Sequence, residues 1–477
     1  MTLVQRFAAL AALAVAFLSP SARAQHDHAG HDHDHDHDHA QPAAMEVAPS
    51  DVEPPATPAG ERLRWLVEGF DGDGEITVDG LFTDEFFQAV PADQLARVLN
   101  NFRVGSRGFA LRRINEESPH RLVAVAQARA DGSMWRMVVG TQAEPPHLID
   151  ALFFQPAPDE AMGPLENWEQ ADATLREVAP QSSLVIFRLT PEGELAPVHR
   201  FNPDERLAIG STFKLWVLGA LAESIRAGEH AWSDNLMIED AHRSLPSGVM
   251  QDLAHGAERP IEEFARQMIS ISDNTATDHL LSLVGRERVE AFMRPTVAAP
   301  ERNLPFLATR EIFLLKLSED ETLMQRYASA DVEGRRRILE EEVAGKAPNI
   351  MMAGGWTGPR AIDSIEWFAT GPELCRLLVR LWRMSDEDGL EPMRGVLGLN
   401  NGLGLSDEKW TRTAFKGGSE PGVMSLTWVL QRAAQPGEVE GPIFAVSMTA
   451  NNPGAMLDDM RLVGLAQRIM ERLEKQP

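Results

Sequence analysis

Three short polar motifs, far apart in the sequence, constrain the fold of this chain more than any other feature. The first is Ser-Thr-Phe-Lys at residues 211–214, directly before an apolar pattern of helical spacing at 215–221. Ser-Asp-Asn at 272–274 is typical of helix caps and turns, and Lys-Gly-Gly at 416–418 stands before a predicted strand at 423–431. The motifs therefore occupy a helix start, a turn and a strand.

Composition sets the frame for these motifs. The chain has 477 residues, of which 43% are hydrophobic and 24% are charged, so we expect two globular domains with unstructured ends. Its formal charge of −26 disfavours nucleic acid and anionic membrane surfaces as partners, because both are themselves negatively charged. Solubility is the simpler explanation of that charge.

The first 24 residues have the pattern of an export signal. Arg6 precedes the apolar run 7–18, which is short for a membrane span, and the small residues at 22 and 24 fit a cleavage site. We therefore predict a signal peptide at 1–24, no membrane insertion after its removal, and a mature protein that is periplasmic or secreted. The single cysteine, Cys375, has no partner for an internal disulfide, and we expect it to be buried.

Histidine alternates with aspartate between residues 26 and 39, a stretch that holds seven of the fourteen histidines. Imidazole and carboxylate together suit zinc, so His31, His33, His35 and His37 are candidate ligands. A flexible repeat fixes no ligand geometry, and a solvated acidic tail is the alternative that we favour. Pro- and Ala-rich residues follow, and the whole of 25–60 is predicted to be a disordered tail and linker.

Residues 61–158 predict a small α+β domain. Apolar residues first recur at helical spacing, which favours short helices. Three later segments alternate as strands do: 109–114, 121–130 and 134–141. Asp131-Gly132 between the last two is a hairpin signal. The proline-rich stretch 156–164 predicts a second linker, which leaves 166–477 as the larger domain.

The first motif has the chemistry of an activated serine. A nucleophile at Ser211 would stand at a helix N-terminus, where unpaired N–H groups and the helix dipole favour developing negative charge. Lys214 follows three residues later on the same face, and a lysine whose pKa is lowered by burial and a second cation can take the serine's proton. Lys416 is the natural second cation. Ser-x-x-Lys alone is a weak signal, and its simplest alternative is a helix cap followed by a solvated lysine.

In this order and these settings, the motifs resemble those of the serine β-lactamase and penicillin-binding protein superfamily, in particular the class A β-lactamases. The resemblance covers about residues 180–477 and is closest at 268–276, Met-Ile-Ser-Ile-Ser-Asp-Asn-Thr-Ala. It implies an α+β fold in which an antiparallel sheet is flanked by helices on both faces.

The resemblance also implies roles for individual residues. Ser211 would be the acylated nucleophile, Lys214 its base, and Ser272 the group that passes a proton to the leaving nitrogen. No metal and no cofactor is expected in such a site.

The substrate would be held by the second and third motifs. Asn274 would bind its amide carbonyl, and Lys416, with Gly418 on the same strand, would attract its carboxylate. The backbone N–H groups of Ser211 and Ser419 would form the oxyanion hole, where each donor is worth roughly 3 kcal/mol in comparable sites.

Two departures from class A sequences matter. Gly417 replaces a threonine or serine, which removes one hydroxyl contact to a substrate carboxylate. Class A enzymes also carry a glutamate four residues before an asparagine, which activates the deacylating water. No such pair follows the second motif here, since Glu301 and Asn303 have the wrong spacing. We therefore expect slow deacylation, or a substrate whose hydrolysis uses Lys214 twice.

The domain order resembles that of clavam-type serine hydrolases, which place a steroid-isomerase-like domain before a β-lactamase-like one. The combined expectation is an exported serine hydrolase that forms an acyl-enzyme at Ser211, with a small-molecule β-lactam, ester or amide as substrate. A peptidoglycan DD-peptidase is the alternative enzyme. A non-catalytic penicillin-recognising or zinc-sequestering envelope protein is the alternative from another class.

Overall fold

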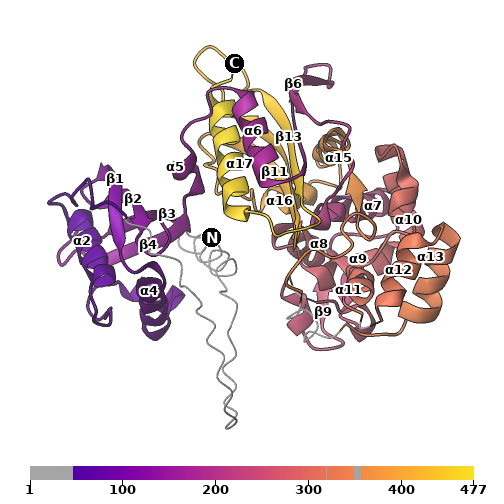
Figure 1. Ribbon diagram of the computed structural model, residues 1–477, viewed down its shortest axis with the longest axis horizontal. Coiled ribbons are helices and arrows are strands. Elements are labelled where there is room, and N and C mark those ends of the chain that lie inside the picture. The colour runs from indigo at the N-terminus through magenta and orange to yellow at the C-terminus, as the bar shows by residue number, and fades with distance from the viewer. Residues whose placement is uncertain (1–46, 246, 319, 349–355, 477) are drawn as a thin grey trace, which may run out of the picture. The chain divides into compact units, whose positions relative to one another are not determined.

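The computed structural model describes residues 47–476 except 246, 319 and 349–355 (Figure 1). The chain divides after Gly163 into two compact units, each with its own hydrophobic core. The predicted signal peptide and the histidine repeat lie outside the described residues. Export, and zinc binding by His31, His33, His35 and His37, therefore stay predictions.

The first unit is built on a four-stranded antiparallel sheet whose strands pair in chain order. They are β1 (Phe109–Ser118), β2 (Arg121–Ala128), β3 (Met134–Thr141) and β4 (Ile149–Pro156). The three predicted strands are thus present, and Gly132 in the turn between β2 and β3 has a φ of 75°. Alternate apolar residues of the sheet share a core with the helices of this unit, which are α2 (Pro58–Asp71), α3 (Asp84–Ala89) and α4 (Ala92–Ser106).

Regular structure extends further in both directions than the sequence suggested. Helix α2 begins at Pro58 inside the predicted linker, and before it Asp51 N donates to Leu111 O of β1 at 3.1 Å. The predicted second linker contains the short helix α5 (Pro158–Met162), whose Asp159 forms an ion pair with Arg136 of β3. Both segments are attached to the sheet of the first unit by contacts between residues far apart in sequence. The proline content of a segment does not reveal such contacts.

The second unit is built on a five-stranded antiparallel sheet in the order β11-β12-β13-β5-β6. The strands are β5 (Gln181–Leu189), β6 (Leu195–Phe201), β11 (Trp410–Glu420), β12 (Val423–Arg432) and β13 (Ile443–Asn451). The two ends of the unit therefore meet in one sheet, with β11 at its edge, and the chain between them forms most of the helices.

Helices cover both faces of this sheet, so the predicted fold class is confirmed. Residues 182–187 of β5 are all buried, which requires cover on both sides. Helix α6 (Trp168–Val178) packs on β5 beside α17 (Asp459–Glu474), whereas α15 (Gly371–Met384) packs across β5, β12 and β13 (Figure 1).

Helix α7 (Lys214–Arg226) is the central helix of the helical part and is buried without interruption from 214 to 222. A helix that is apolar on nearly every side must be surrounded by other elements. It packs against α9 (Asn274–Val284), α10 (Arg286–Met293) and α15. A Cβ atom on Gly219 would overlap the Phe292 ring, so only glycine allows α10 to come this close.

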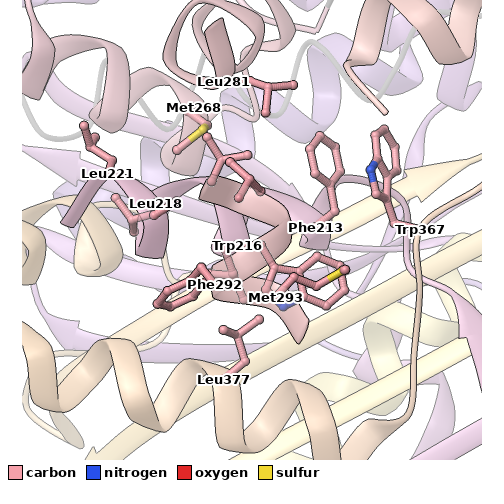
Figure 2. Close-up of a cluster of buried hydrophobic side chains, with 14 of the residues drawn as sticks. Phe213, Trp216, Leu218, Leu221, Met268, Leu281, Phe292, Met293, Trp367 and Leu377 are labelled. Atoms are coloured by element: carbon pink, nitrogen blue, oxygen red, sulfur yellow. The ribbon is translucent and has the colours of Figure 1, made fainter. Parts of the chain in front are cut away.

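Figure 2 shows part of this core, including Phe213 and Trp367, whose rings are stacked with centroids 3.5 Å apart. Further elements are α8 (Ile261–Ser270), α11 (Thr309–Lys316), α12 (Glu321–Ser329), α13 (Val332–Ile338), α16 (Pro392–Gly398) and the short pairs β7 (Leu207–Ala208) with β10 (Phe368–Ala369) and β8 (Asn235–Met237) with β9 (Glu258–Pro260). Within the described residues, no helix is long and apolar enough to cross a membrane.

Candidate active site

Ser211 lies in a tight 3₁₀ turn, Gly210–Phe213, that leads directly into α7. Side chains three residues apart lie above one another in such a turn, so Lys214 is on the same face as Ser211. The turn begins at Gly210 with a φ of +47°, which residues with a side chain rarely adopt. Ser211 is partly exposed, while the two residues after it are buried. The candidate nucleophile is therefore accessible on an otherwise buried turn.

The turn is fixed to the rest of the unit on two sides. Thr212 Oγ1 donates to Ser425 O of β12 at 3.3 Å. On the other side, Trp367 stacks on Phe213, and Trp367 O accepts from Ile209 N at 3.0 Å. Ser211 thus sits between the edge of the sheet and the segment that carries Trp367.

Lys214 joins the first motif to the second. Its side chain is completely buried, and Nζ donates to Ser272 O at 2.6 Å, Ser272 Oγ at 3.0 Å and Asn274 Oδ1 at 2.7 Å. These contacts use all three protons of an ammonium group. Among the residues that the structure describes, none hydrogen-bonds to Ser211 Oγ, so a direct bond between the serine and the lysine is not formed here.

The surroundings of Lys214 disfavour its positive charge. Burial lowers the pKa of Lys214 well below its usual value, and the charge of Lys416 lowers it further. Asp273 and Asp278 act in the opposite direction but do not reverse the shift. A neutral amine has a lone pair and can accept a proton from a hydroxyl group.

Ser272 is held in a strained conformation. Its φ is +61°, a left-handed value that is uncommon for residues other than glycine. Ser272 O accepts hydrogen bonds from Ser247 Oγ at 2.7 Å and from Lys214, which stabilise this conformation. The strain places the Ser272 hydroxyl between two lysines, because Lys416 Nζ also contacts Ser272 Oγ, at 3.1 Å.

Asp273 fixes the loop in front of the site. It is fully buried, caps α9 by accepting from Ala276 N at 2.7 Å, and also accepts from Val249 N at 2.6 Å and Met250 N at 2.8 Å. The sequence assigned no role to Asp273 or to Ser247. The position of Asp273 before a helical apolar pattern is a cap signal that could have indicated it, whereas the contact of Ser247 depends on tertiary structure alone.

Asn274 is oriented from both ends of its amide. Its Nδ2 donates to Leu245 O at 3.0 Å, which turns Oδ1 toward Lys214. The backbone N–H of Asn274 donates to Ser247 O at 3.0 Å. The predicted carbonyl-binding side chain is therefore placed beside the predicted base.

Lys416 lies on the edge strand β11 and is almost completely buried. Its Nζ donates to Gly417 O at 2.5 Å and to Ser272 Oγ. Burial lowers the pKa of Lys416 to about 7. In the described part of the chain, no carboxylate forms an ion pair with Lys214 or Lys416, so the two lysines leave the site able to attract an anionic group.

The strand residues Gly418 and Ser419 lie against the turn that carries Ser211. A Cβ atom on Gly418 would be 2.5 Å from Ser211 N and 2.6 Å from Thr212 N, and one on Gly210 would be 3.0 Å from Ser419 N. Real Cβ atoms do not come this close to the backbone, so glycine at 418 is needed for the strand to reach the turn. All predicted site residues outside the histidine repeat are thereby brought to one place.

Two family models match the chain. One is the beta-lactamase enzyme family, over residues 171–323, and the other is the ORF 12 gene product N-terminal family, over residues 54–142. The segment matched by the beta-lactamase model contains the first and second motifs, and it supports the resemblance to the serine β-lactamase and penicillin-binding protein superfamily.

Solved structures of this superfamily resemble this chain at low sequence identity. A β-lactamase from Sphaerobacter thermophilus is 20% identical, with 65% of this chain and 99% of that one covered and a TM-score of 0.43. A class A β-lactamase from Bacteroides cellulosilyticus is 14% identical (68% and 100% covered, TM-score 0.42), and PBP-A in an acyl-enzyme complex with penicillin G is 16% identical (65% and 98%, 0.41). No curated protein matches the sequence.

Glu301 and Asn303, whose spacing differs from that of the class A pair, have different surroundings. Glu301 is exposed in the short turn Pro300–Asn303, and Asn303 is buried, where it exchanges hydrogen bonds of 2.7 and 3.0 Å with the Phe368 backbone. Neither residue contacts the three motifs among the described residues. Asp278, one turn beyond Asn274, accepts from Thr309 N at 2.8 Å and caps α11, which is a structural role.

Proposed function

We propose that this protein is a serine hydrolase of the β-lactamase type that forms an acyl-enzyme at Ser211, with a β-lactam or a related ester or amide as substrate. The observation that carries the proposal is the buried Lys214, whose amine contacts Ser272 and Asn274 one 3₁₀ turn from a partly exposed serine. The pattern at residues 1–24 supports a location outside the cytoplasm.

The first chemical step begins when Ser211 turns toward Lys214. Ser211 Oγ attacks the carbonyl carbon while its proton passes to the neutral Nζ of Lys214. Negative charge then develops on the carbonyl oxygen, which the backbone N–H groups of Ser211 and Ser419 would stabilise. The close packing of Gly418 on the turn supports this pairing of donors.

The second step releases the leaving group. The C–N or C–O bond of the substrate breaks, and the proton on Lys214 moves to the leaving atom through Ser272 Oγ, which is within hydrogen-bond distance of both lysines. Asn274 would hold the substrate amide, and Lys416 an anionic group. Because no carboxylate of the described residues forms a hydrogen bond or ion pair with Ser211, Lys214 or Lys416, deacylation would again depend on Lys214 and would be slow.

The surface beside Lys416 offers a substrate carboxylate fewer polar contacts than a class A site would. Gly417 lies opposite Leu426 on β12, and a Cβ atom at 417 would be 3.0 Å from Phe415 Cζ. The hydroxyl that class A enzymes place here is therefore replaced by apolar atoms. Esters should compete well with carboxylated β-lactams for this reason.

Intact mass spectrometry after exposure to benzylpenicillin, and hydrolysis of nitrophenyl acetate and a chromogenic cephalosporin, test the proposal. The wild type should gain the mass of one acyl group, Ser211→Ala should gain none, and Ser282→Ala, an exposed serine outside the site, should behave as the wild type. Absence of an adduct and of ester hydrolysis in the wild type would favour a non-catalytic binding protein. Release of D-alanine from a peptide, with no stable adduct, would favour the DD-peptidase.

A further inference from the structure

A buried ion cluster lies at the end of the edge strand β11, and the proposed chemistry does not use it. Lys316 Nζ, at the end of α11, donates to Glu366 Oε1 at 2.7 Å and to Glu420 Oε1 at 2.5 Å. The side chains of Lys316, Glu366 and Glu420 are 0%, 1% and 8% exposed. The Trp356 ring lies 5.7 Å from Lys316 Nζ on a further side. Three segments distant in sequence therefore meet around one ammonium group.

The charges of this cluster do not balance unless it keeps a proton. Two ionised carboxylates and one ammonium would leave a net negative charge in a site without solvent, which costs several kcal/mol. Two carboxyl groups that contact the same buried ammonium group relieve this by sharing one proton, because like charges so close together cannot both ionise. Burial and the charge of Glu366 raise the pKa of Glu420 well above its usual value, against the opposing effect of Lys316, which favours a proton on this pair of carboxyl groups.

Glu420 acts on one side of the candidate oxyanion hole. It is the last residue of β11 and directly follows Ser419, whose backbone N–H is one of the two proposed donors. The strand continues through Gly418, which packs on the turn at Ser211. A displacement of Glu420 therefore moves Ser419 with it.

Glu366 acts on the other side. Glu366 Oε2 accepts from Trp367 N at 3.2 Å, and Trp367 both stacks on Phe213 and accepts from Ile209 N. Ile209 and Phe213 bracket Ser211, the residue that carries the second proposed donor. The cluster is thus linked to both halves of the oxyanion hole.

We propose that Glu420 is a positioning residue: with Lys316 and Glu366 it keeps one shared carboxyl proton, and this neutral cluster holds the Ser419 N–H opposite the Ser211 N–H. This inference rests on the proposed function of Ser211. When the proton is lost at alkaline pH, the two carboxylates repel each other, the end of β11 moves, and acylation slows. The charged groups that act on Glu420 are Lys316 from α11 and Glu366 from the segment before β10.

The shared proton can be detected without any activity. At a pH slightly above neutral, the infrared spectrum of the wild type should contain the carbonyl stretch of a protonated carboxylic acid, and this band should be absent from Glu420→Gln and from Glu366→Gln. Its absence from the wild type would overturn the proposal. The infrared band does not depend on Ser211. A missing band and a failure of the proposed function can therefore be told apart.

The positioning role is tested by the acylation rate as a function of pH. Glu420→Gln keeps the hydrogen-bonding shape but cannot ionise, so it should acylate within about twofold of the wild type at neutral pH and lose less rate at alkaline pH. Glu366→Gln should also lose less of its acylation rate at alkaline pH than the wild type does, because only one carboxylate then remains beside Lys316. Glu420→Ala should be slower by about tenfold or more at every pH, since a displaced oxyanion donor has a cost of that order.

The matched control is Glu373→Gln, a buried acid paired with Arg206 at 2.7 Å that does not contact β11. It should leave the pH profile unchanged. Deprotonation of Lys416 should lower the acylation rate at alkaline pH in the wild type and in every variant alike. A difference between the pH profiles of the variants and the wild type therefore reports on the cluster. An alkaline limb in both glutamine variants identical to that of the wild type would overturn the proposal, even if Glu420→Ala does not fold.

Discussion

Lys416 Nζ lies 3.1 Å from Ser272 Oγ. The same hydroxyl oxygen is 3.0 Å from Lys214 Nζ, so two amines from distant parts of the chain share one small polar group. Two ammonium ions cannot both be stable this close together in a buried site without a carboxylate. This arrangement favours the neutral form of one of the two lysines, and the first prediction below follows from it.

Replacing Lys416 with methionine should raise the pKa of Lys214, because the positive charge of Lys416 now lowers it. A higher pKa means that the neutral base forms at higher pH, so the acidic limb of the acylation rate should move to higher pH. In the wild type, the alkaline side should fall as Lys416 loses its charge near a pH of about 7. Stopped-flow acylation by nitrophenyl acetate measures both limbs. An acidic limb that stays in place would contradict the coupling between the two lysines.

Gly418→Ala should slow acylation by about 100-fold, since its Cβ would lie 2.5 Å from Ser211 N and would push the edge strand away from the turn. Gly417→Ala is the matched control: its Cβ would meet side-chain atoms and no backbone, with Phe415 Cζ at 3.0 Å and Leu426 Cδ2 at 3.4 Å. Adduct formation with benzylpenicillin, followed by mass, compares the two. Equal rates would show that the strand does not need to approach Ser211.

Asp273→Asn should lower the free energy of unfolding by about 2 kcal/mol, because one amide oxygen cannot replace two carboxylate oxygens that accept from three backbone N–H groups. Chemical denaturation measures this loss. Asp320→Asn, the exposed cap of α12, should cost less. Acylation should slow as well in Asp273→Asn, since the loop with Ser247 supports Ser272.

Asp278 should make stability depend on pH in a defined direction. Burial raises the pKa of Asp278 from 3.8 to about 6, so its contribution is present below about 3.8 and is lost as the pH rises through about 6. The total change is at most about 3 kcal/mol. Unfolding curves of the wild type and Asp278→Asn should therefore diverge across this range, with the wild type losing stability relative to the variant as the pH rises.

The exposed Asp240 provides a control of opposite sign. Its hydrogen bond with Arg243 lowers the pKa of Asp240, so its contribution is present above its ordinary pKa and is lost as the pH falls. Asp240→Asn should therefore approach the wild type in stability at acidic pH. If both variants change in the same direction, the assignment of the effect to Asp278 is wrong.

Local patterns in the sequence identified three of the four strands of the first unit and the helix after Ser211, because hydrophobic periodicity depends only on neighbouring residues. They did not predict β4. The same patterns misplaced the linkers. Residues 48–57 have few apolar side chains, yet Ser50 Oγ accepts from Leu111 N of β1 at 3.0 Å. Such contacts depend on where a distant strand lies, which composition does not encode.

The sequence by itself determined which residue types stand at the helix start, the turn and the strand, and hence the chemistry that the three motifs can carry together. Only the tertiary structure decided how they meet. Burial and the approach of Lys416 shift the proton equilibrium of Lys214, and both effects fall steeply with distance and solvent access. The contacts of Ser247 and Glu420 likewise arise from chain segments that are neighbours only after folding.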